Sequence, residues 1–241
     1  TMMGKLGDDP FSQVHLKAMK ELGMPDRGVM VGPGAATGNA LIMVDESTGE
    51  NLIAVTLGAN ATISAREIEE RADVITNCGI LLVQLEVNPD ALSQAIDLAW
   101  RNDALVIFNS APASPFDAGL YEKISIITPN ETEAMALTGI EIRSKQDARR
   151  AAAWFFDRGV EAVLITLGDQ GVFVSDQTRN CLIEPIPVRV VDTTGAGDAF
   201  SGNLAASLAR GLDLWDAAAY ANAAAALSVT RIGTTPAMPE R

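Results

Sequence analysis

The stretch GILLVQLEVNPDALSQAIDLAWRNDALVIFNS, Gly79–Ser110, contains the pattern that decides the fold. Apolar runs at 80–85 and 104–108 have the length of buried strands, and the segment 89–101 between them spaces its apolar residues as a helix does. A strand, a helix and a second strand in this order predict a crossover between parallel strands. Because parallel sheets are covered on both faces, the pattern predicts an α/β fold.

The same alternation continues to the end of the chain. Apolar runs at 124–127 and 162–166 predict strands, and helices are expected near 130–138, 145–158, 197–210 and 215–228. Before the alternation begins, a first helix is predicted to end at Gly23, and Ala40–Leu57 is predicted to form a β-hairpin with its turn at 46–50. We therefore predict a mostly parallel sheet flanked by helices, preceded by a hairpin.

Composition excludes several functional classes. The 241 residues are 48% hydrophobic and carry a net charge of −13, which disfavours binding to nucleic acid. No apolar run approaches the roughly 20 residues of a membrane helix, so we expect a cytoplasmic protein without a membrane partner. Cys78 and Cys181 lack the spacing of a zinc site, and the only histidine, His15, lies in a helical pattern, which leaves acid–base chemistry to carboxylates.

Polar residues follow the apolar runs. Ligands of such sheets bind beyond the carboxyl ends of the strands, so these residues are the candidates for chemistry. They are Gln84 and Glu86 after the first run, Asn109 after the second, the segment 128–133 after the third, Thr166 and Gly168 after the fourth, and Asp192 after a fifth run that ends at Val191.

The segment VVDTTGAGDAFSGNLAASLARG, Val190–Gly211, places Gly-Ala-Gly and Asp198 at the start of a helix. Gly195 and Gly197 let the backbone approach a ligand, and the unpaired amides of the first turn attract an anion. One interpretation of Asp198 is an acid that complements the helix dipole. The other is a base that deprotonates a hydroxyl while the amides stabilise a phosphoryl group in transfer.

Three further signals are weaker. Asn130 and Glu133 have the spacing of a capping box, and Glu133 also suits Mg²⁺ on a nucleotide, directly or through water. Glu86 is either a solvated loop acid or an acceptor for a sugar hydroxyl. The segment TLGDQG, Thr166–Gly171, is typical of an ordinary glycine turn between strands.

Together these motifs resemble the pfkB-type carbohydrate kinases. The segments GKLGDDPF, GANA, QLE, NSAPAS, TPNETEA, TLGDQG, DTTGAGDAFSGN and NAAAALSVTRIGT occur in the family's order along nearly the whole chain. DTTGAGDAF is a specific signature, and QLE, ALSVTRIGT and NSAPAS, in which proline commonly replaces Ser110, favour the ribokinase branch. The resemblance implies a ribokinase-like α/β fold and phosphorylation of D-ribose to D-ribose 5-phosphate by ATP.

The resemblance also implies roles for individual residues. Asp198 would be the catalytic base, and Gly195, Ala196 and Gly197 would supply the anion hole. Glu86 would contact ribose, and Glu133 would serve Mg²⁺. Residues implied at the ATP site are Asn130, Thr166, Gly168, Gly171 and Asn222, the last beside the adenine. A monovalent cation such as K⁺ would be bound by Asp192, Thr194, Ser228, Arg231 and Gly233, with Ala237 where a serine often supplies another oxygen.

The two ends of the chain depart from the family pattern. The family begins with sugar-binding strands and a Gly-Gly-Lys-Gly-x-Asn segment, and this chain starts after them and stops just past TTPAMPER. We therefore expect one domain over 1–241, truncated at its N-terminus and slightly at its C-terminus, with a partial β lid at 35–58 through which the full-length protein forms a homodimer. The alternatives are another pfkB-type sugar or nucleoside kinase, or a non-catalytic homologue that keeps only nucleotide binding.

Overall fold

The elements of the protein group into two compact units. The computed structural model describes residues 1–44 and 51–239. The first unit contains Thr1–Asn77 and Glu86–Leu98, and the second contains Cys78–Leu85 and Ala99–Arg241. The expectation of a single domain therefore stays a prediction.

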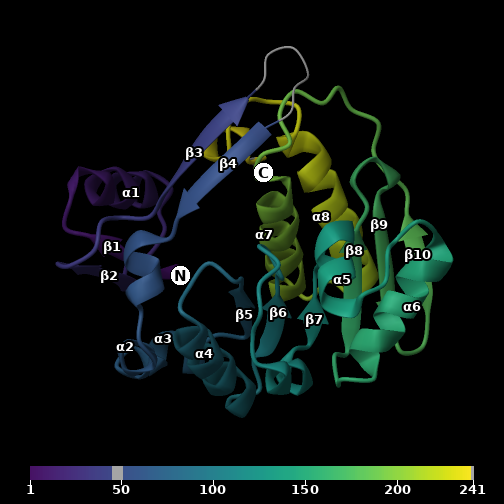
Figure 1. Ribbon diagram of the computed structural model, residues 1–241, viewed down its shortest axis with the longest axis horizontal. Helices are drawn as coiled ribbons and strands as arrows, with labels where there is room; N and C mark the ends of the chain where they lie inside the picture. Colours follow the sequence, from purple (N-terminus) through teal and green to yellow (C-terminus); the bar gives the residue numbers. More distant parts are fainter. Residues whose placement is uncertain (45–50, 240–241) are drawn as a thin grey trace. The chain divides into compact units, whose positions relative to one another are not determined.

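The second unit is built on a six-stranded sheet (Figure 1). The strands from β5 to β8 run parallel, and β9 and β10 continue the sheet in antiparallel pairs. In spatial order the strands are β10 (Asn180–Ile183), β9 (Val172–Asp176), β8 (Ala162–Thr166), β7 (Ile126–Ile127), β6 (Leu105–Phe108) and β5 (Ile80–Val83). The predicted mostly parallel sheet is confirmed.

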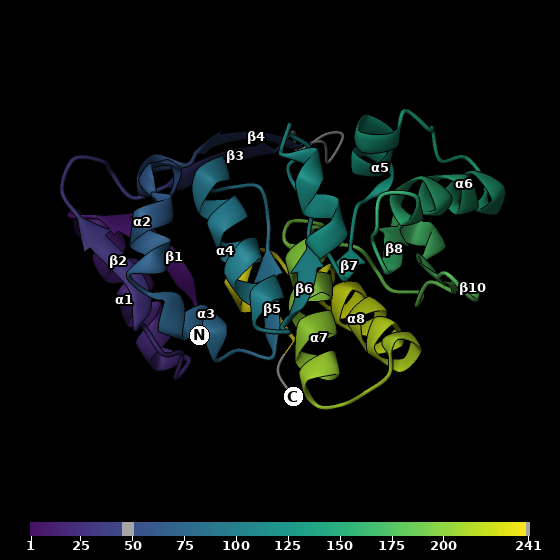
Figure 2. The same ribbon diagram turned by 90° about the horizontal axis from the view of Figure 1, so that it is seen from below.

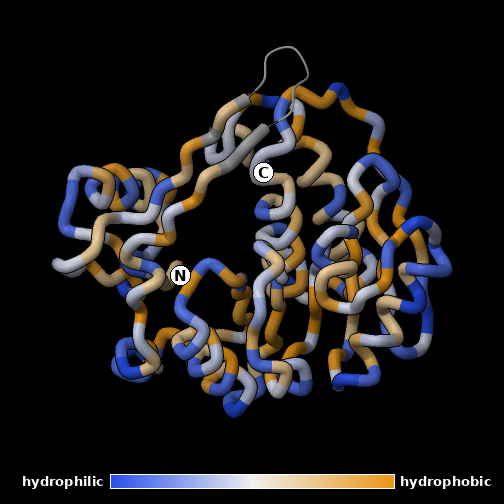
Figure 3. The backbone as a smooth tube through the Cα atoms, viewed as in Figure 1, coloured by the Kyte–Doolittle hydropathy of each residue, from blue (hydrophilic) through white to orange (hydrophobic). Residues whose placement is uncertain are grey.

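Helices cover both faces of this sheet. On one face α7 (Ala196–Ala209) and α8 (Leu214–Ser228) lie side by side, and their Phe200 and Ala217 share an apolar cluster with Leu164 of β8 (Figure 2). On the other face α6 (Lys145–Phe156) packs on β8 and β9, and α5 (Glu131–Thr138) precedes it. The strands are mainly orange in Figure 3, as expected for a sheet buried from both sides.

The first unit contains two small sheets. Strands β1 (Met3–Gly7) and β2 (Gly28–Gly32) are parallel and are connected through α1 (Pro10–Glu21). Strands β3 (Asn39–Val44) and β4 (Asn51–Thr56) pair antiparallel, which confirms the predicted hairpin, although its turn at 46–50 lies outside the described residues. The remaining helices are α2 (Ala65–Glu69), α3 (Ala72–Thr76) and α4 (Pro89–Arg101), whose last residues belong to the second unit. In the described part of the chain no helix is long and apolar enough to cross a bilayer.

One strand implied by the sequence is absent. The apolar run before Asp192 has no strand over residues 184–191. Pro185 and Pro187 each remove a backbone donor from this run, so it cannot complete a hydrogen-bonded ladder. Conversely, β1 and β2 were not predicted, because each contains two glycines that obscure the apolar pattern.

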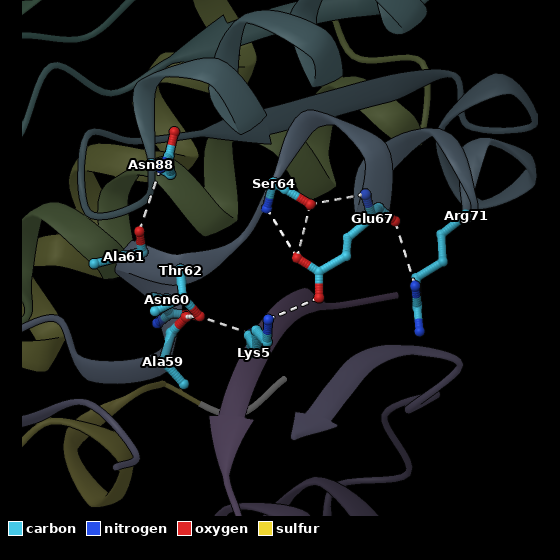
Figure 4. Close-up of polar contacts among 9 residues, drawn as sticks. All are labelled: Lys5, Ala59, Asn60, Ala61, Thr62, Ser64, Glu67, Arg71 and Asn88. Atoms are coloured by element: carbon cyan, nitrogen blue, oxygen red, sulfur yellow. Dashed lines mark hydrogen bonds and ion pairs between the residues drawn. The ribbon is translucent and has the colours of Figure 1, made fainter. Parts of the chain in front are cut away.

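A partly buried ion pair ties β1 to α2 (Figure 4). Lys5 Nζ lies 2.7 Å from Glu67 Oε1, and the side chains are 15% and 27% exposed. Glu67 also completes a capping box with Ser64 at the start of α2. The hydrogen bond from Lys5, followed by that from the Ser64 backbone, lowers the pKa of Glu67 from 4.5 to about 2.

Glu67→Gln is expected to destabilise the protein at pH 7 by about 1–3 kcal/mol, the usual worth of a hydrogen bond to a charged group. Because the folded pKa of Glu67 is lowered, its contribution is present above pH 4.5 and is lost as the pH falls toward about 2. Urea denaturation followed by circular dichroism should therefore show wild type and variant converging below pH 4.5. Glu70→Gln is the control, because the Arg66–Glu70 pair is exposed and contributes little. Parallel stability curves for Glu67→Gln and wild type would contradict the assignment.

Candidate active site

The N-terminus of α7 has no side-chain cap. Gly195, the residue before its first turn, has φ +80°, a left-handed conformation that favours glycine, and no side chain caps the helix. By contrast, side chains cap α1, α5, α6 and α8, where the acceptors are Asp9, Asn130, Ser144 and Asp213. The first-turn amides of α7 thus keep the anion-binding capacity that side chains satisfy at those four helices.

Asp198 lies in this open first turn. Its side chain reaches the surface, yet protein atoms surround it at longer range, and the resulting desolvation raises the pKa of its carboxyl group. A raised pKa improves a carboxylate as a proton acceptor. Of the three predicted anion-hole amides, that of Ala196 donates to Thr193 O over 3.2 Å, whereas those of Gly195 and Gly197 donate to no acceptor among the described residues, and the Asp198 amide lies beside them.

The loops before α7 and after α8 are held together by Asp192. Its two carboxylate oxygens accept hydrogen bonds from the backbone of Thr194 and Gly233, each at 2.9 Å, and the contacts with these two residues lower its pKa. A Cβ on Gly195 would meet side-chain atoms of Thr234 and Met238 at 3.3–3.5 Å, so the cap of α7 lies against the same C-terminal segment. The structure therefore brings Asp192, Thr194 and Gly233 of the predicted K⁺ set together beside the cap of α7.

The Arg231 and Ser228 positions of the same set are adjacent in space, because Arg231 N–H donates to Ser228 O over 3.4 Å. The Ser228 side chain is buried and donates to Ala225 O. Ala237 is buried in a short turn of 3-10 helix and offers no side-chain oxygen. The oxygen ligands that suit K⁺ would thus come from Asp192 and the main chain.

Asn130 and Glu133 form the predicted capping box at the start of α5. Asn130 Oδ1 accepts from Glu133 N at 2.8 Å, and Glu133 Oε2 accepts from Asn130 N at 3.0 Å. A parallel bridge pairs Asn130 with Thr166, the last residue of the neighbouring strand β8. Two residues predicted at the ATP site are therefore neighbours at the carboxyl ends of the parallel strands β7 and β8.

The Glu133 carboxylate fits a magnesium ion held through water. Besides the bond from Asn130 N, it accepts hydrogen bonds from Asn130 Nδ2 at 2.9 Å and Ser110 Oγ at 3.3 Å. Three of about four acceptor positions are thus taken. Among the described residues no cluster of three His, Cys, Asp or Glu side chains could hold a metal. Since Mg²⁺ keeps several waters and binds nucleotide phosphates, one such carboxylate meets its requirements.

Two of the remaining ATP-site candidates, Gly171 and Asn222, lie against the segment 183–185. A Cβ on Gly171 would lie only 2.1 Å from Ile183 O, and Asn222 Nδ2 donates to Glu184 O over 3.0 Å. Gly168, which begins the turn between β8 and β9, is exposed, and a Cβ added to it would meet no atom within 4 Å. The turn is confirmed, and the nucleotide roles of these residues stay predictions.

Glu86 belongs to the first unit and the other candidates to the second, so its sugar contact stays a prediction.

The structure adds contacts that the motifs did not predict. Buried Ser201 of α7 accepts a hydrogen bond from Asn109 Nδ2 over 3.3 Å. The buried hydroxyl of Thr128 has no hydrogen-bond partner among the described residues. Asn109 and Thr128 were expected among the polar residues that follow strands, whereas the contact with Ser201 and the unsatisfied hydroxyl were not predicted.

The chain is similar to known proteins along its whole length. The profile of the family described as "pfkB family carbohydrate kinase" matches residues 1–241. The ribokinase of Haemophilus influenzae is 36% identical over 98% of this chain and 77% of that protein. A bifunctional ribokinase/ribose-5-phosphate isomerase A of Fructilactobacillus sanfranciscensis is also 36% identical, over 100% of this chain and 45% of that protein. A structure of Arabidopsis thaliana ribokinase complexed with ribose and ATP superposes with a TM-score of 0.92 at 30% identity, over 99% of this chain and 78% of the other.

Gly171→Ala is expected to destabilise the protein by several kcal/mol, because φ +88° is strained for alanine and its Cβ would overlap Ile183 O. Gly168→Ala is the matched control: its φ is +54°, its surroundings are open, and the backbone term alone costs about 1–2 kcal/mol. Thermal denaturation of both variants measures the difference. Equal losses would show that the contact with the segment 183–185 does not constrain Gly171.

Proposed function

Because this chain belongs to the pfkB family of carbohydrate kinases, we propose that it uses ATP to phosphorylate D-ribose, giving D-ribose 5-phosphate. The open N-terminus of α7 with Asp198 in its first turn carries this proposal. Side chains cap α1, α5, α6 and α8, whereas no side chain caps α7. The unpaired amides in the first turn of α7 can therefore donate hydrogen bonds to a bound anion.

The placement of these groups supports the following reaction. Asp198 removes the proton of the sugar's primary hydroxyl, whose oxygen forms a bond to the terminal phosphorus of ATP. The bond from that phosphorus to the bridging oxygen breaks, and ADP leaves with the electron pair. The amides at the start of α7 stabilise the negative charge on the phosphoryl oxygens during transfer.

Residues of the second unit would hold the nucleotide. Asn130 lies next to Thr166, and Gly171 and Asn222 both contact the segment 183–185. Glu133 would hold Mg²⁺ through water, and bound Mg²⁺ neutralises charge on the phosphates. The K⁺ role of Asp192 is supported by its position between Thr194 and Gly233, beside the cap of α7.

Ribose as the acceptor is supported by the relatives. Two proteins named as ribokinases are 36% identical to this chain, and the Arabidopsis structure holds ribose and ATP. Glu86 is the residue of this chain proposed to accept a hydrogen bond from the sugar.

A homodimer through the lid is the proposed assembly. The β3–β4 hairpin exposes Leu41 and Met43, which lie on the same face of β3, at 68% and 56% of their surface. Exposed apolar side chains of this size on paired strands are typical of a face that another surface covers.

Asp198→Asn, in the natural full-length protein, is expected to lower kcat about 10²–10⁴-fold, the usual contribution of a general base. Because the pKa of Asp198 is raised, the wild-type rate should fall as the pH drops through that pKa, and the variant should lose this acid limb. Ribose-dependent ADP release measures both.

The control is Asp216→Asn, which removes the first-turn acid of α8. It has the same relation to a helix dipole as Asp198 and should leave turnover unchanged. Equal turnover in the two variants would reduce Asp198 to a dipole-complementing acid and remove the basis of the proposed mechanism.

Glu86→Gln is expected to raise KM for ribose about tenfold, with little change in KM for ATP, because a hydrogen bond to a charged acceptor becomes a weaker neutral one. Initial rates at varied ribose and ATP give the two constants. A rise confined to the KM for ATP would place Glu86 at the nucleotide and not at the sugar.

A further inference from the structure

Asn109 is a buried side chain that joins the sheet of the second unit to α7. It directly follows β6 and is 8% exposed. Its Oδ1 accepts a hydrogen bond from Ala111 N at 3.1 Å, which fixes the orientation of the amide group. Its Nδ2 donates to Ser201 Oγ of α7 over 3.3 Å, and the two residues are 92 positions apart in the sequence.

Ser201 lies close to the end of α7 that carries Asp198. It is 4% exposed and follows Gly197 by four residues. Residues four apart in an α-helix lie on the same face, so Ser201 is one turn beyond Gly197. Asp198, three residues before Ser201, is a neighbour on the same side of the helix. A hydrogen bond that holds Ser201 therefore also restrains the first turn.

Apolar packing and this hydrogen bond constrain α7 in different ways. Phe200 of α7 packs in one cluster with Ile107 and Ile126 of the sheet. Such contacts are non-directional, and they decide which face of the helix is buried. A hydrogen bond depends steeply on distance and angle. The contact between Asn109 and Ser201 therefore restricts the rotation of α7 and its shift along its own axis.

The proposed nucleotide residues belong to the sheet, and the proposed base belongs to the helix. Asn130 and Thr166 are paired at the carboxyl ends of β7 and β8, whereas Asp198 lies on α7. Asn109 follows β6, which is hydrogen-bonded to β7. Its bond to Ser201 thus connects the strands that would hold ATP with the helix that would activate the sugar.

We propose that Asn109 is a positioning residue, which acts through Ser201 to hold the first turn of α7 in place at the carboxyl ends of the strands. This inference rests on the proposed function, because it gives that turn its role in phosphoryl transfer. The terminal phosphate of ATP must meet both the Gly197 amide and the hydroxyl activated by Asp198, so a shift of α7 misplaces both groups at once. Asn109 touches no reacting atom in this scheme.

Ser207 provides a matched comparison in the same helix. Like Ser201 it is a buried serine of α7, at 6% exposure, but it lies near the other end of the helix. Ser201→Ala and Ser207→Ala therefore make the same replacement at two buried positions, with the same gain in helix propensity. Only Ser201→Ala removes the acceptor of Asn109.

The first experiment records the backbone amide NMR signals of Gly197 and Asp198 in the natural full-length protein without nucleotide. Asn109→Ala should move both signals in the wild-type background, because the first turn shifts when the hydrogen bond to Ser201 is lost. In the Ser201→Ala background Asn109→Ala should move neither signal, since that hydrogen bond is already absent. Equal movement in both backgrounds, or none in either, would overturn the inference.

The second experiment measures kcat and the KM values for ribose and ATP from ribose-dependent ADP release by the full-length protein. Ser201→Ala should lower kcat about tenfold and leave both KM values within about twofold, because misplaced reacting groups weaken the transition state more than the bound substrates. Ser207→Ala should keep the wild-type kcat. A wild-type kcat in Ser201→Ala, or an equal loss in Ser207→Ala, would overturn the inference.

Two controls keep this result separate from a loss of stability. Rates are expressed per folded molecule, determined by circular dichroism, so a purely structural role of the hydrogen bond leaves kcat unchanged. Ser201→Ala leaves the contact between Asn109 and Ala111 intact, so its comparison with Ser207→Ala stands even where Asn109→Ala does not fold.

Asp198→Asn separates this inference from the proposed function. If Asp198→Asn keeps wild-type turnover, the error lies in the proposed function, because α7 then carries no base. The NMR comparison uses no activity and still decides whether Asn109 positions the first turn of α7. If Asp198→Asn lowers kcat and Ser201→Ala does not, the proposed function stands and the positioning role of Asn109 is wrong.

Discussion

The unsatisfied amides at the start of α7 are the constraint around which the second unit is organised. A helix end without a side-chain cap is stable only when its surroundings fix it by other means. Gly195 takes the left-handed conformation and packs against Thr234 and Met238, while Asp192 accepts hydrogen bonds from both flanking loops. The stability that a cap would have supplied therefore comes from the loops, and the amides stay available to a phosphoryl group.

This arrangement also explains the puzzling position of Asp198. A carboxylate next to an anion-binding helix end repels its ligand while both are charged, which makes it a poor choice for binding alone. In the proposed mechanism the repulsion disappears once the carboxylate has accepted a proton from the attacking hydroxyl. The surrounding protein, by raising the pKa of Asp198, favours that protonated form. In that mechanism the pair would favour the transition state over the bound substrates, which is the requirement for catalysis.

The sequence predicted regular elements well where their period was clear. The segment 89–101 was predicted to the residue as α4, and the runs around 104–108 and 162–166 became β6 and β8, because long apolar patterns are decided by local chemistry. It failed where backbone chemistry overrides hydropathy: Pro185 and Pro187 prevent a strand before Asp192, and glycines hide β1 and β2. Of the site, the capping box and the turn after β8 were predictable from spacing. The contacts Ser110–Glu133 and Asn109–Ser201 join residues 23 and 92 positions apart, which no local pattern encodes.

Glu133 shows why a structural and a functional interpretation of one residue need not compete. Its capping role uses the oxygens toward Asn130, and this use fixes the carboxylate more firmly than an exposed acid could be fixed. Burial at the cap also removes water, which strengthens any remaining electrostatic interaction and makes the charge harder to keep. For the proposed metal role, a buried cap requires further donors that stabilise the ionised form, and in this chain the Ser110 hydroxyl is such a donor.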